Sequence, residues 1–275
     1  WSMRYFFYSV SIWMICCDLS FPISISFEPT TSCNLRCPEC PSGLREFTRP
    51  TGMLEKSFFQ QTIDDIYKEL LYLIFYFQGE PYLNPDFLKM VKYAYDKGIY
   101  TATSTNAHYL TDAKAKATVE SGLDRLIISI DGTSQDVYQS YRVGGNLEKV
   151  IEGAKNIVKW KKALNSKTPF VFFQFLVVKP NEHQIEEIKK LGKEIGVDQV
   201  RFKTAQVYDF ENDPNQLIPS IKKVFPEAEE NILKNITRLS EAEQLYNQAI
   251  TLHKNKLLEQ KGNEIHIPVL KLQKV

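Results

Sequence analysis

The sequence predicts an α/β fold in which six parallel strands alternate with helices. Strand-like and helix-like patterns alternate regularly from about residue 21 to residue 207. Such alternation indicates a parallel sheet with right-handed crossovers. Unusual polar residues also follow several of the strands, and α/β barrels carry their chemistry at the carboxyl ends of their strands.

The strands are indicated by alternation and by apolar runs. Residues 23–27 alternate apolar and polar side chains, and residues 71–77 are continuously apolar, as expected of a buried parallel strand. Aromatic residues make up 12% of the chain, and many fall at strand-like positions. The expected strands cover residues 23–27, 71–77, 99–104, 125–130, 170–178 and 199–203.

The helices carry capping and termination signals. Asn84 and Pro85 open the second helix, because proline suits the first helical turn, and Gly98 ends it. Thr111 caps the third helix, and Gly122 ends it. The fourth helix has apolar residues at helical spacing along its whole length. The expected helices cover residues 53–70, 84–95, 111–119, 147–164 and 182–195.

Three cysteines lie close together after the first strand, in the run Thr31-Ser-Cys-Asn-Leu-Arg-Cys-Pro-Glu-Cys-Pro-Ser-Gly43. Cys33, Cys37 and Cys40 have the spacing C-x3-C-x2-C, and no cysteine follows them. Thiolates are the usual ligands of iron–sulfur clusters, and three of them leave one iron of a four-iron cluster open.

Other uses of these cysteines are alternatives. A zinc site would need a fourth ligand from one of the 4 histidines, none of which has paired spacing with the cysteines. A disulfide framework would need an even count, and the chain has 5 cysteines. A thiol redox motif at Cys37-Pro-Glu-Cys40 should open a helix in a thioredoxin-like fold, which the alternation of strands and helices does not support.

The composition disfavours several classes of partner. The 275 residues include 34 basic and 33 acidic side chains, a net charge of +1, so no basic excess indicates nucleic acid. Residues 5–19 are mostly apolar, but the run is too short to span a bilayer and Asp18 interrupts it. We expect residues 1–20 to be an apolar extension packed on the barrel, with Cys16 and Cys17 buried, in a cytoplasmic protein.

Polar residues follow the first four strands, and the carboxyl ends of parallel strands meet at one edge of a sheet. We therefore expect one site there. Gln78-Gly79-Glu80-Pro81 ends the second strand, although a plain turn is the alternative. Ser104-Thr105-Asn106 ends the third strand. Asp131 follows Ser129 by two residues and so should point to the same face, although it could instead be a turn residue before a glycine.

These motifs resemble the radical S-adenosylmethionine (radical SAM) superfamily over about residues 21–207. The resemblance is strongest to the peptide- and protein-modifying members that carry a C-terminal SPASM extension. It implies a partial (β/α)6 TIM-like barrel. It also implies a [4Fe–4S] cluster on Cys33, Cys37 and Cys40, with S-adenosylmethionine (SAM) as the second cofactor.

The resemblance further implies cofactor contacts. Backbone groups around Gly79 and Glu80 would accept from the methionine amine of SAM, since glycine allows close approach and the carboxylate supplies negative charge, and Pro81 would fix the turn. Arg142 would pair with the cofactor carboxylate, or else face solvent. Val178 and the preceding valine would pack on adenine, or else belong to the core. The remaining polar contacts, including a hold on the ribose, would come from Thr105, Asn106, Ser129 and Asp131.

The sequence departs from the family in two places. Glu39 stands where many relatives place an aromatic residue, so stacking on adenine must come from elsewhere. Residues 208–275 contain no cysteine for auxiliary clusters. We interpret them as a helical tail, truncated or divergent from the usual extension, that covers the open edge of the barrel or docks a partner.

The resemblance implies a radical enzyme. It would reductively cleave SAM and use the 5′-deoxyadenosyl radical to abstract hydrogen from a substrate, with a peptide or protein as the expected class. The electron would come from a flavodoxin- or ferredoxin-type donor, and no nucleic-acid or membrane partner is expected. The alternative is a non-catalytic scaffold that binds an iron–sulfur cluster or zinc.

Overall fold

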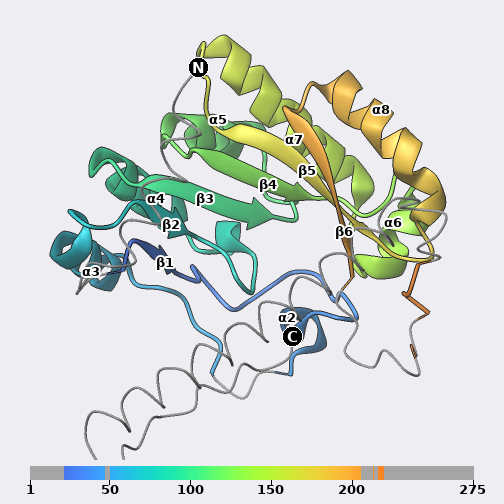
Figure 1. The fold of residues 1–275 in the computed structure, drawn as a ribbon, viewed down its shortest axis with the longest axis horizontal. Coiled ribbons are helices and arrows are strands. Elements are labelled where there is room, and N and C mark those ends of the chain that lie inside the picture. The colour runs from blue at the N-terminus through green and yellow to red at the C-terminus, as the bar shows by residue number, and fades with distance from the viewer. Residues whose placement is uncertain (1–21, 47–49, 206–212, 214–215, 220–275) are drawn as a thin grey trace, which may run out of the picture. The chain divides into compact units, whose positions relative to one another are not determined.

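The computed structural model describes residues 22–46, 50–205, 213 and 216–219. Within these residues the strands form one sheet, in the order β1-β2-β3-β4-β5-β6, and each neighbouring pair is parallel. The expected α/β architecture is therefore confirmed (Figure 1). The strands are β1 (Ser24–Ser26), β2 (Tyr72–Ile74), β3 (Tyr100–Thr105), β4 (Arg125–Ser129), β5 (Phe170–Val177) and β6 (Gln199–Thr204).

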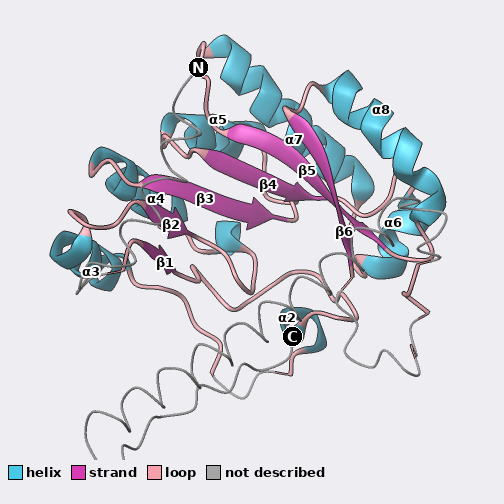
Figure 2. Cartoon of the chain, viewed as in Figure 1, coloured by secondary structure: helices cyan, strands magenta, loops and turns pink. Residues whose placement is uncertain are grey.

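Helices connect the strands, and the longer ones run along one side of the curved sheet (Figure 2). Short 3-10 turns cover Pro81–Leu83 and Glu182–Gln184. The helices are α2 (Pro41–Leu44), α3 (Lys56–Ile66), α4 (Phe87–Asp96), α5 (Asp112–Glu120), α6 (Gln135–Tyr141), α7 (Leu147–Ala163) and α8 (Ile185–Ile195). The short helix α2 lies apart from them, close to the carboxyl ends of the strands (Figure 1).

The hydrophobic core lies between the sheet and this helical layer. On β5, Val171, Phe173 and Phe175 are fully buried. On α7, the apolar positions at helical spacing are buried as expected, among them Val150 and Ile157. Burial of these stripes fixes each strand end relative to its neighbours, which positions the loops at the carboxyl edge.

Several local expectations need correction. The apolar run at 71–77 leaves the sheet after Ile74, and Phe77 is 78% exposed, so only part of the run is a buried strand. Helix α4 begins at Phe87 rather than at Asn84, because the Asn84 side chain instead donates to the carbonyl oxygens of Pro29 and Leu54.

Helix α6 was not expected from the sequence. It is short, and no side-chain hydrogen bond caps its first turn. Burial of Tyr138 and Tyr141 anchors it against the rest of the fold. Tertiary packing therefore determines this helix, and local sequence signals do not reveal it.

The expectations for residues 1–20, for Cys16 and Cys17, and for a helical tail at residues 208–275 fall almost wholly outside the described residues. In the described part of the chain, we find no helix with the length and apolar character needed to cross a membrane.

Candidate functional site

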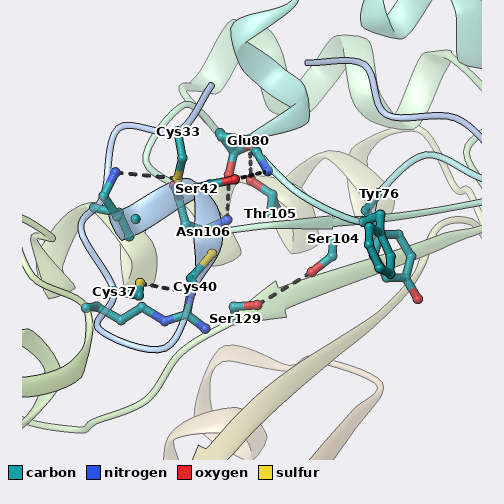
Figure 3. A pocket seen from close by; sticks show the side chains of 15 residues that line it. Cys33, Cys37, Cys40, Ser42, Tyr76, Glu80, Ser104, Thr105, Asn106 and Ser129 are labelled. Atoms are coloured by element: carbon teal, nitrogen blue, oxygen red, sulfur yellow. Dashed lines mark hydrogen bonds between the residues drawn. The ribbon is translucent and has the colours of Figure 1, made fainter. Parts of the chain in front are cut away.

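The three cysteines lie on one loop between β1 and α2. The amide of Cys40 donates to the carbonyl oxygen of Cys37 at 3.3 Å, which closes a tight turn between them. Cys40 then caps α2, and Pro41 occupies the first position of that helix. The loop brings all three sulfurs to the lining of one pocket (Figure 3).

Gly43 in α2 allows this helix to pack directly on the cysteine loop. A Cβ atom at Gly43 would lie 2.4 Å from the carbonyl oxygen of Cys37 and 2.6 Å from its amide nitrogen. Any side chain there would push α2 away from the loop backbone. The sequence motif included this glycine, but its packing role emerges only from the structure.

The turn after β2 packs on the other side of the same loop. Gly79 has a φ of +77°, and a Cβ atom there would lie 2.0 Å from the carbonyl oxygen of Thr30. The amide of Gly79 donates to the Ser42 hydroxyl at 2.9 Å, and the amide of Glu80 donates to the carbonyl oxygen of Ser32 at 2.8 Å. The Gly79-Glu80 backbone thus holds the start of the cysteine loop in place.

Glu80 joins the ends of β2 and β3. Its carboxylate is 1% exposed, and it accepts hydrogen bonds from the Thr105 hydroxyl at 2.7 Å and the Asn106 amide at 2.8 Å. Burial raises the pKa of Glu80 to about 7, although these hydrogen bonds oppose the rise. Glu80 and Thr105 therefore hold the ends of β2 and β3 together, and both residues also line the pocket.

Each cysteine sulfur has a polar side chain beside it from a different part of the fold. Asn106 Nδ2 lies 3.8 Å from Cys33 Sγ, and Arg142 Nη1 lies 3.8 Å from Cys37 Sγ. Cys40 Sγ lies 3.5 Å from Gln78 Oε1. Nitrogen donors beside a sulfur stabilise its deprotonated, metal-binding form.

Arg142 is fixed by a buried carboxylate. Its Nε donates to Asp131 Oδ2 at 2.5 Å, and the other oxygen of Asp131 accepts from the Leu176 amide at 2.7 Å. Asp131 is 0% exposed, so both of its oxygens serve protein partners. Arg142 follows the last residue of α6, and this helix carries it to Cys37.

The pocket collects residues from the cysteine loop, the ends of β2, β3 and β4, and α6. Most expected cofactor contacts lie in it, but Pro81, Asp131 and Val178 do not. Val178 is fully buried in a core cluster that includes Cys37 and Leu35. The lining residues are Cys33, Leu35, Cys37, Cys40, Ser42, Gly43, Tyr76, Phe77, Gly79, Glu80, Ser104, Thr105, Asn106, Ser129 and Arg142.

Sequence reasoning missed several of these lining residues. Tyr76 and Phe77 bring aromatic rings to a site where Glu39 supplies none. Ser104, which the sequence placed at the end of the third strand, meets Ser129 across neighbouring strands, with their hydroxyl oxygens 3.5 Å apart. The aromatic residues just before Gln78 were a signal, because they stand where the chain leaves the sheet.

Burial disfavours ionisation of the cysteine thiols. It raises the pKa of the Cys37 thiol to about 11, although the positive charge of Arg142 opposes the rise. Burial also raises the pKa of Cys33. Without a metal, these sulfurs therefore hold their protons at neutral pH, and metal binding must displace them.

The donor set suits a cluster of several metal atoms. Among the described residues, no three histidine, cysteine or acidic side chains converge on one point as a single ion would require. A four-iron cluster binds each thiolate at a different iron, so its ligands do not have to converge in this way. Three sulfurs around one pocket, with nitrogen donors beside two of them, fit such a cluster.

Comparison with known proteins shows the family. The model of the Radical SAM superfamily matches residues 27–192. The chain belongs to the radical SAM superfamily. Members of this superfamily are enzymes that use a [4Fe–4S] cluster and SAM, so the resemblance seen in the motifs is confirmed.

The chain spans about half the length of several curated relatives. One is the tungsten-containing aldehyde ferredoxin oxidoreductase cofactor-modifying protein of Pyrococcus furiosus, 30% identical over 62% of this chain and 48% of its own. Another is the AdoMet-dependent heme synthase of Methanosarcina barkeri, which is 28% identical over 64% of this chain and 48% of its own length. The PqqA peptide cyclase of Bradyrhizobium diazoefficiens is 24% identical over 68% and 47%.

Solved structures agree on the fold. Streptococcus suis SuiB bound to S-adenosylmethionine has a TM-score of 0.60 at 14% identity, over 86% of this chain and 55% of its own. Native anSMEcpe with bound AdoMet has a TM-score of 0.61 at 19% identity, over 78% and 62%. The partial-barrel fold expected for a radical SAM protein is therefore confirmed.

Proposed function

We propose that this chain is a radical SAM enzyme whose cluster is held by Cys33, Cys37 and Cys40. The observation that supports this most directly is the convergence of the three sulfurs with the ends of β2, β3 and β4 in one pocket. When bound, the reduced cluster supplies an electron that cleaves SAM into methionine and a 5′-deoxyadenosyl radical, which abstracts hydrogen from a substrate.

The residues of the chain bind and orient the cofactors in this proposal. Arg142, held by Asp131, offers guanidinium N–H groups to the methionine carboxylate of SAM. The carbonyl groups of the Gly79-Glu80 turn would accept from the methionine amine, and Gly79 permits close approach. Ser129 and Asn106 supply polar contacts to the ribose and the methionine moiety. Asp131 acts through Arg142, because its own oxygens are occupied.

The decisive experiment is anaerobic reconstitution with iron and sulfide, followed by reduction with dithionite and an assay for 5′-deoxyadenosine. We expect one four-iron cluster per chain and slow formation of 5′-deoxyadenosine without substrate. Cys37→Ala should abolish both, and Cys16→Ser with Cys17→Ser should change neither. A reducible cluster that yields no 5′-deoxyadenosine, and no spectral change with SAM, would leave the scaffold as the function.

We propose a peptide or protein as the substrate, with a flavodoxin- or ferredoxin-type protein as the electron donor. A ring as exposed as that of Phe77, at the lining of the pocket, offers an apolar contact to a large substrate. The PqqA peptide cyclase, named for action on a peptide, is among the curated relatives.

A mixture of synthetic ten-residue peptides tests the substrate class. It should raise 5′-deoxyadenosine formation above the substrate-free rate, whereas a mixture of free amino acids should not. Phe77→Ala should lower the ratio of the peptide-stimulated rate to the substrate-free rate. Phe58→Ala is the matched control, because Phe58 is also an exposed ring, on α3, but does not line the pocket. Stimulation by the amino acids alone would exclude a peptide substrate.

A further inference from the structure

Gln78 lies between the cysteine loop and α2, and no role has been assigned to its side chain so far. Its Oε1 atom is 3.5 Å from Cys40 Sγ and 3.2 Å from the Ser42 hydroxyl. Its backbone amide donates to the Glu28 side chain at 3.1 Å, which fixes the residue at the end of β2. The amide group is therefore held beside one of the three sulfurs.

Gln78 Oε1 accepts two hydrogen bonds at this place, one of them from the Cys40 sulfur. The Cys40 S–H and the Ser42 O–H both donate to Gln78 Oε1, while the Ser42 oxygen accepts from the Gly79 amide. The Cys40 S–H, the Ser42 O–H and the Gly79 N–H therefore each have an acceptor. The contact between Cys40 and Gln78 Oε1 exists as a hydrogen bond only through the S–H hydrogen.

The other two sulfurs are arranged in the opposite way. Cys33 has the Asn106 side-chain amide beside it, and Cys37 has the Arg142 guanidinium, and both groups donate N–H toward sulfur. These contacts suit an iron-bound sulfur without change. Only the contact at Cys40 is reversed, because there the sulfur donates to an oxygen.

Metal binding would leave two acceptors facing each other at this contact. An iron-bound Cys40 has no S–H, so Gln78 Oε1 would oppose a sulfur that also only accepts. A half-turn of the side-chain amide removes the conflict. Nε2 then donates one hydrogen to Cys40 and one to the Ser42 oxygen, and the Ser42 hydroxyl turns to the Thr31 carbonyl oxygen, already 3.3 Å away.

We propose that Gln78 is a positioning residue whose side-chain amide turns over when Cys40 exchanges its proton for iron. The proton leaves to solvent, and the chain makes or breaks no other covalent bond. After this turn each of the three sulfurs has one side-chain N–H donor, from Gln78, Asn106 or Arg142, and Cys33 also accepts from the Leu35 amide. The inference rests on the proposed function, because it requires a cluster on these cysteines.

The turned amide should raise the reduction potential of the cluster. Hydrogen bonds to cluster sulfurs favour the reduced state, which carries more negative charge. Gln78→Met keeps the volume of the side chain but removes the donor. Gln78→Glu keeps an acceptor for the Cys40 S–H and the Ser42 hydroxyl but has no N–H to offer. Both variants should load iron yet be harder to reduce.

The test is anaerobic redox titration of the reconstituted chain, followed by electron paramagnetic resonance. For Gln78→Met we expect the reduction equilibrium to weaken about tenfold, a fall of about 59 mV for a one-electron couple. Gln78→Glu should fall at least as far, because it also adds negative charge. Gln135→Met is the control, since the Gln135 side chain bonds to Gln139 and backbone groups away from the sulfurs.

The outcomes separate this inference from the proposed function. If the wild-type chain loads no cluster, the proposed function fails. If the wild type loads a cluster and both Gln78 variants keep its potential and spectrum, only the role of Gln78 is overturned. If neither variant loads iron while Gln135→Met does, Gln78 is needed for assembly itself, and the turnover proposal is likewise overturned.

Discussion

Arg142 depends on the carboxylate beneath it. Asp131 is 0% exposed, and the Arg142 side chain is only 16% exposed, so the two charges form a largely buried pair. Removing one member of such a pair leaves the other buried without compensation. The position of Arg142 beside Cys37 should therefore depend on Asp131 as much as on α6.

Asp131→Asn tests this dependence. The variant keeps an oxygen for the Leu176 amide but removes the charge opposite Arg142, so we expect the free energy of unfolding to fall by about 3 kcal/mol. Urea titration of the metal-free protein measures it. Asp112→Asn is the control, because the Lys159–Asp112 pair is exposed to solvent and should contribute little to stability. Equal losses of unfolding free energy in the two variants would show that the buried pair contributes no more to stability than the exposed pair.

For single residues, the sequence predicted which side chains belong to the site better than it predicted where those side chains point. The spacing of the cysteines predicted their common use. The two-residue step from Ser129 to Asp131 predicted a shared face, but Ser129 lines the pocket and Asp131 does not. Strand β4 ends at Ser129, so the period-2 rule stops applying there. The partners of Asp131 come from α6 and β5, which are distant in sequence.

At the scale of elements, the cysteine loop is held between α2 and the turn after β2. Both contacts pass through glycines, Gly43 and Gly79, whose missing side chains let backbone meet backbone. The sequence motifs contained both residues, but the close approaches involve segments that only the folded chain brings together. The early end of β2 and the presence of α6 were missed for the same reason, because tertiary packing decides them.

Gly43→Ala should disrupt the cysteine loop. The added methyl group would lie 2.4 Å from the Cys37 carbonyl oxygen, so α2 must move. We expect most of the iron content to be lost after reconstitution, while far-ultraviolet circular dichroism stays close to that of the wild type. Gly52→Ala is the matched control, because nothing lies within 4 Å of a Cβ atom there. Normal iron content in Gly43→Ala would show that the loop tolerates displacement of α2.

Comparing Gly79→Ala with Gly98→Ala distinguishes the cost of a left-handed backbone conformation from the cost of a steric clash. Gly79 and Gly98 have nearly the same conformation, with φ of +77° and +78°. A Cβ atom would lie 2.0 Å from the Thr30 carbonyl oxygen at Gly79, but nothing lies within 4 Å at Gly98. Gly98→Ala should cost about 1 kcal/mol from the left-handed conformation alone. Gly79→Ala should cost clearly more in urea unfolding, and equal costs would refute the packing argument.

At the scale of the whole described chain, side-chain contacts join neighbouring strand ends along the carboxyl edge of the sheet. Glu80 connects β2 to β3, Ser104 meets Ser129 between β3 and β4, and Asp131 connects the end of β4 to β5. Because polar side chains join the strand ends along this edge, a change in their protonation should alter both the stability of the fold and the geometry of the site.

Glu80 should therefore give the metal-free protein a measurable pH dependence. Burial raises its folded-state pKa from an ordinary value of 4.5 to about 7. Between these two pH values the folded chain holds a proton that the unfolded chain has released, so this group makes stability fall as pH rises from about 4.5 to about 7. Outside that window its contribution is constant.

Glu80→Gln removes the titration and should flatten this part of the profile. Urea unfolding at pH 5 and pH 7.5, under reducing conditions, gives the change in stability for each protein. The variant loses the hydrogen bond from the Asn106 amide and is less stable throughout, so only the difference between the two pH values is compared. Other groups such as His108, whose pKa is lowered by burial, titrate in both proteins and cancel. Glu120→Gln, in an exposed pair with Lys116, should keep the wild-type slope. Equal losses of stability in Glu80→Gln and the wild type between the two pH values would contradict this prediction. The carboxyl group of Glu80 would then be ionised in the folded protein at both pH values.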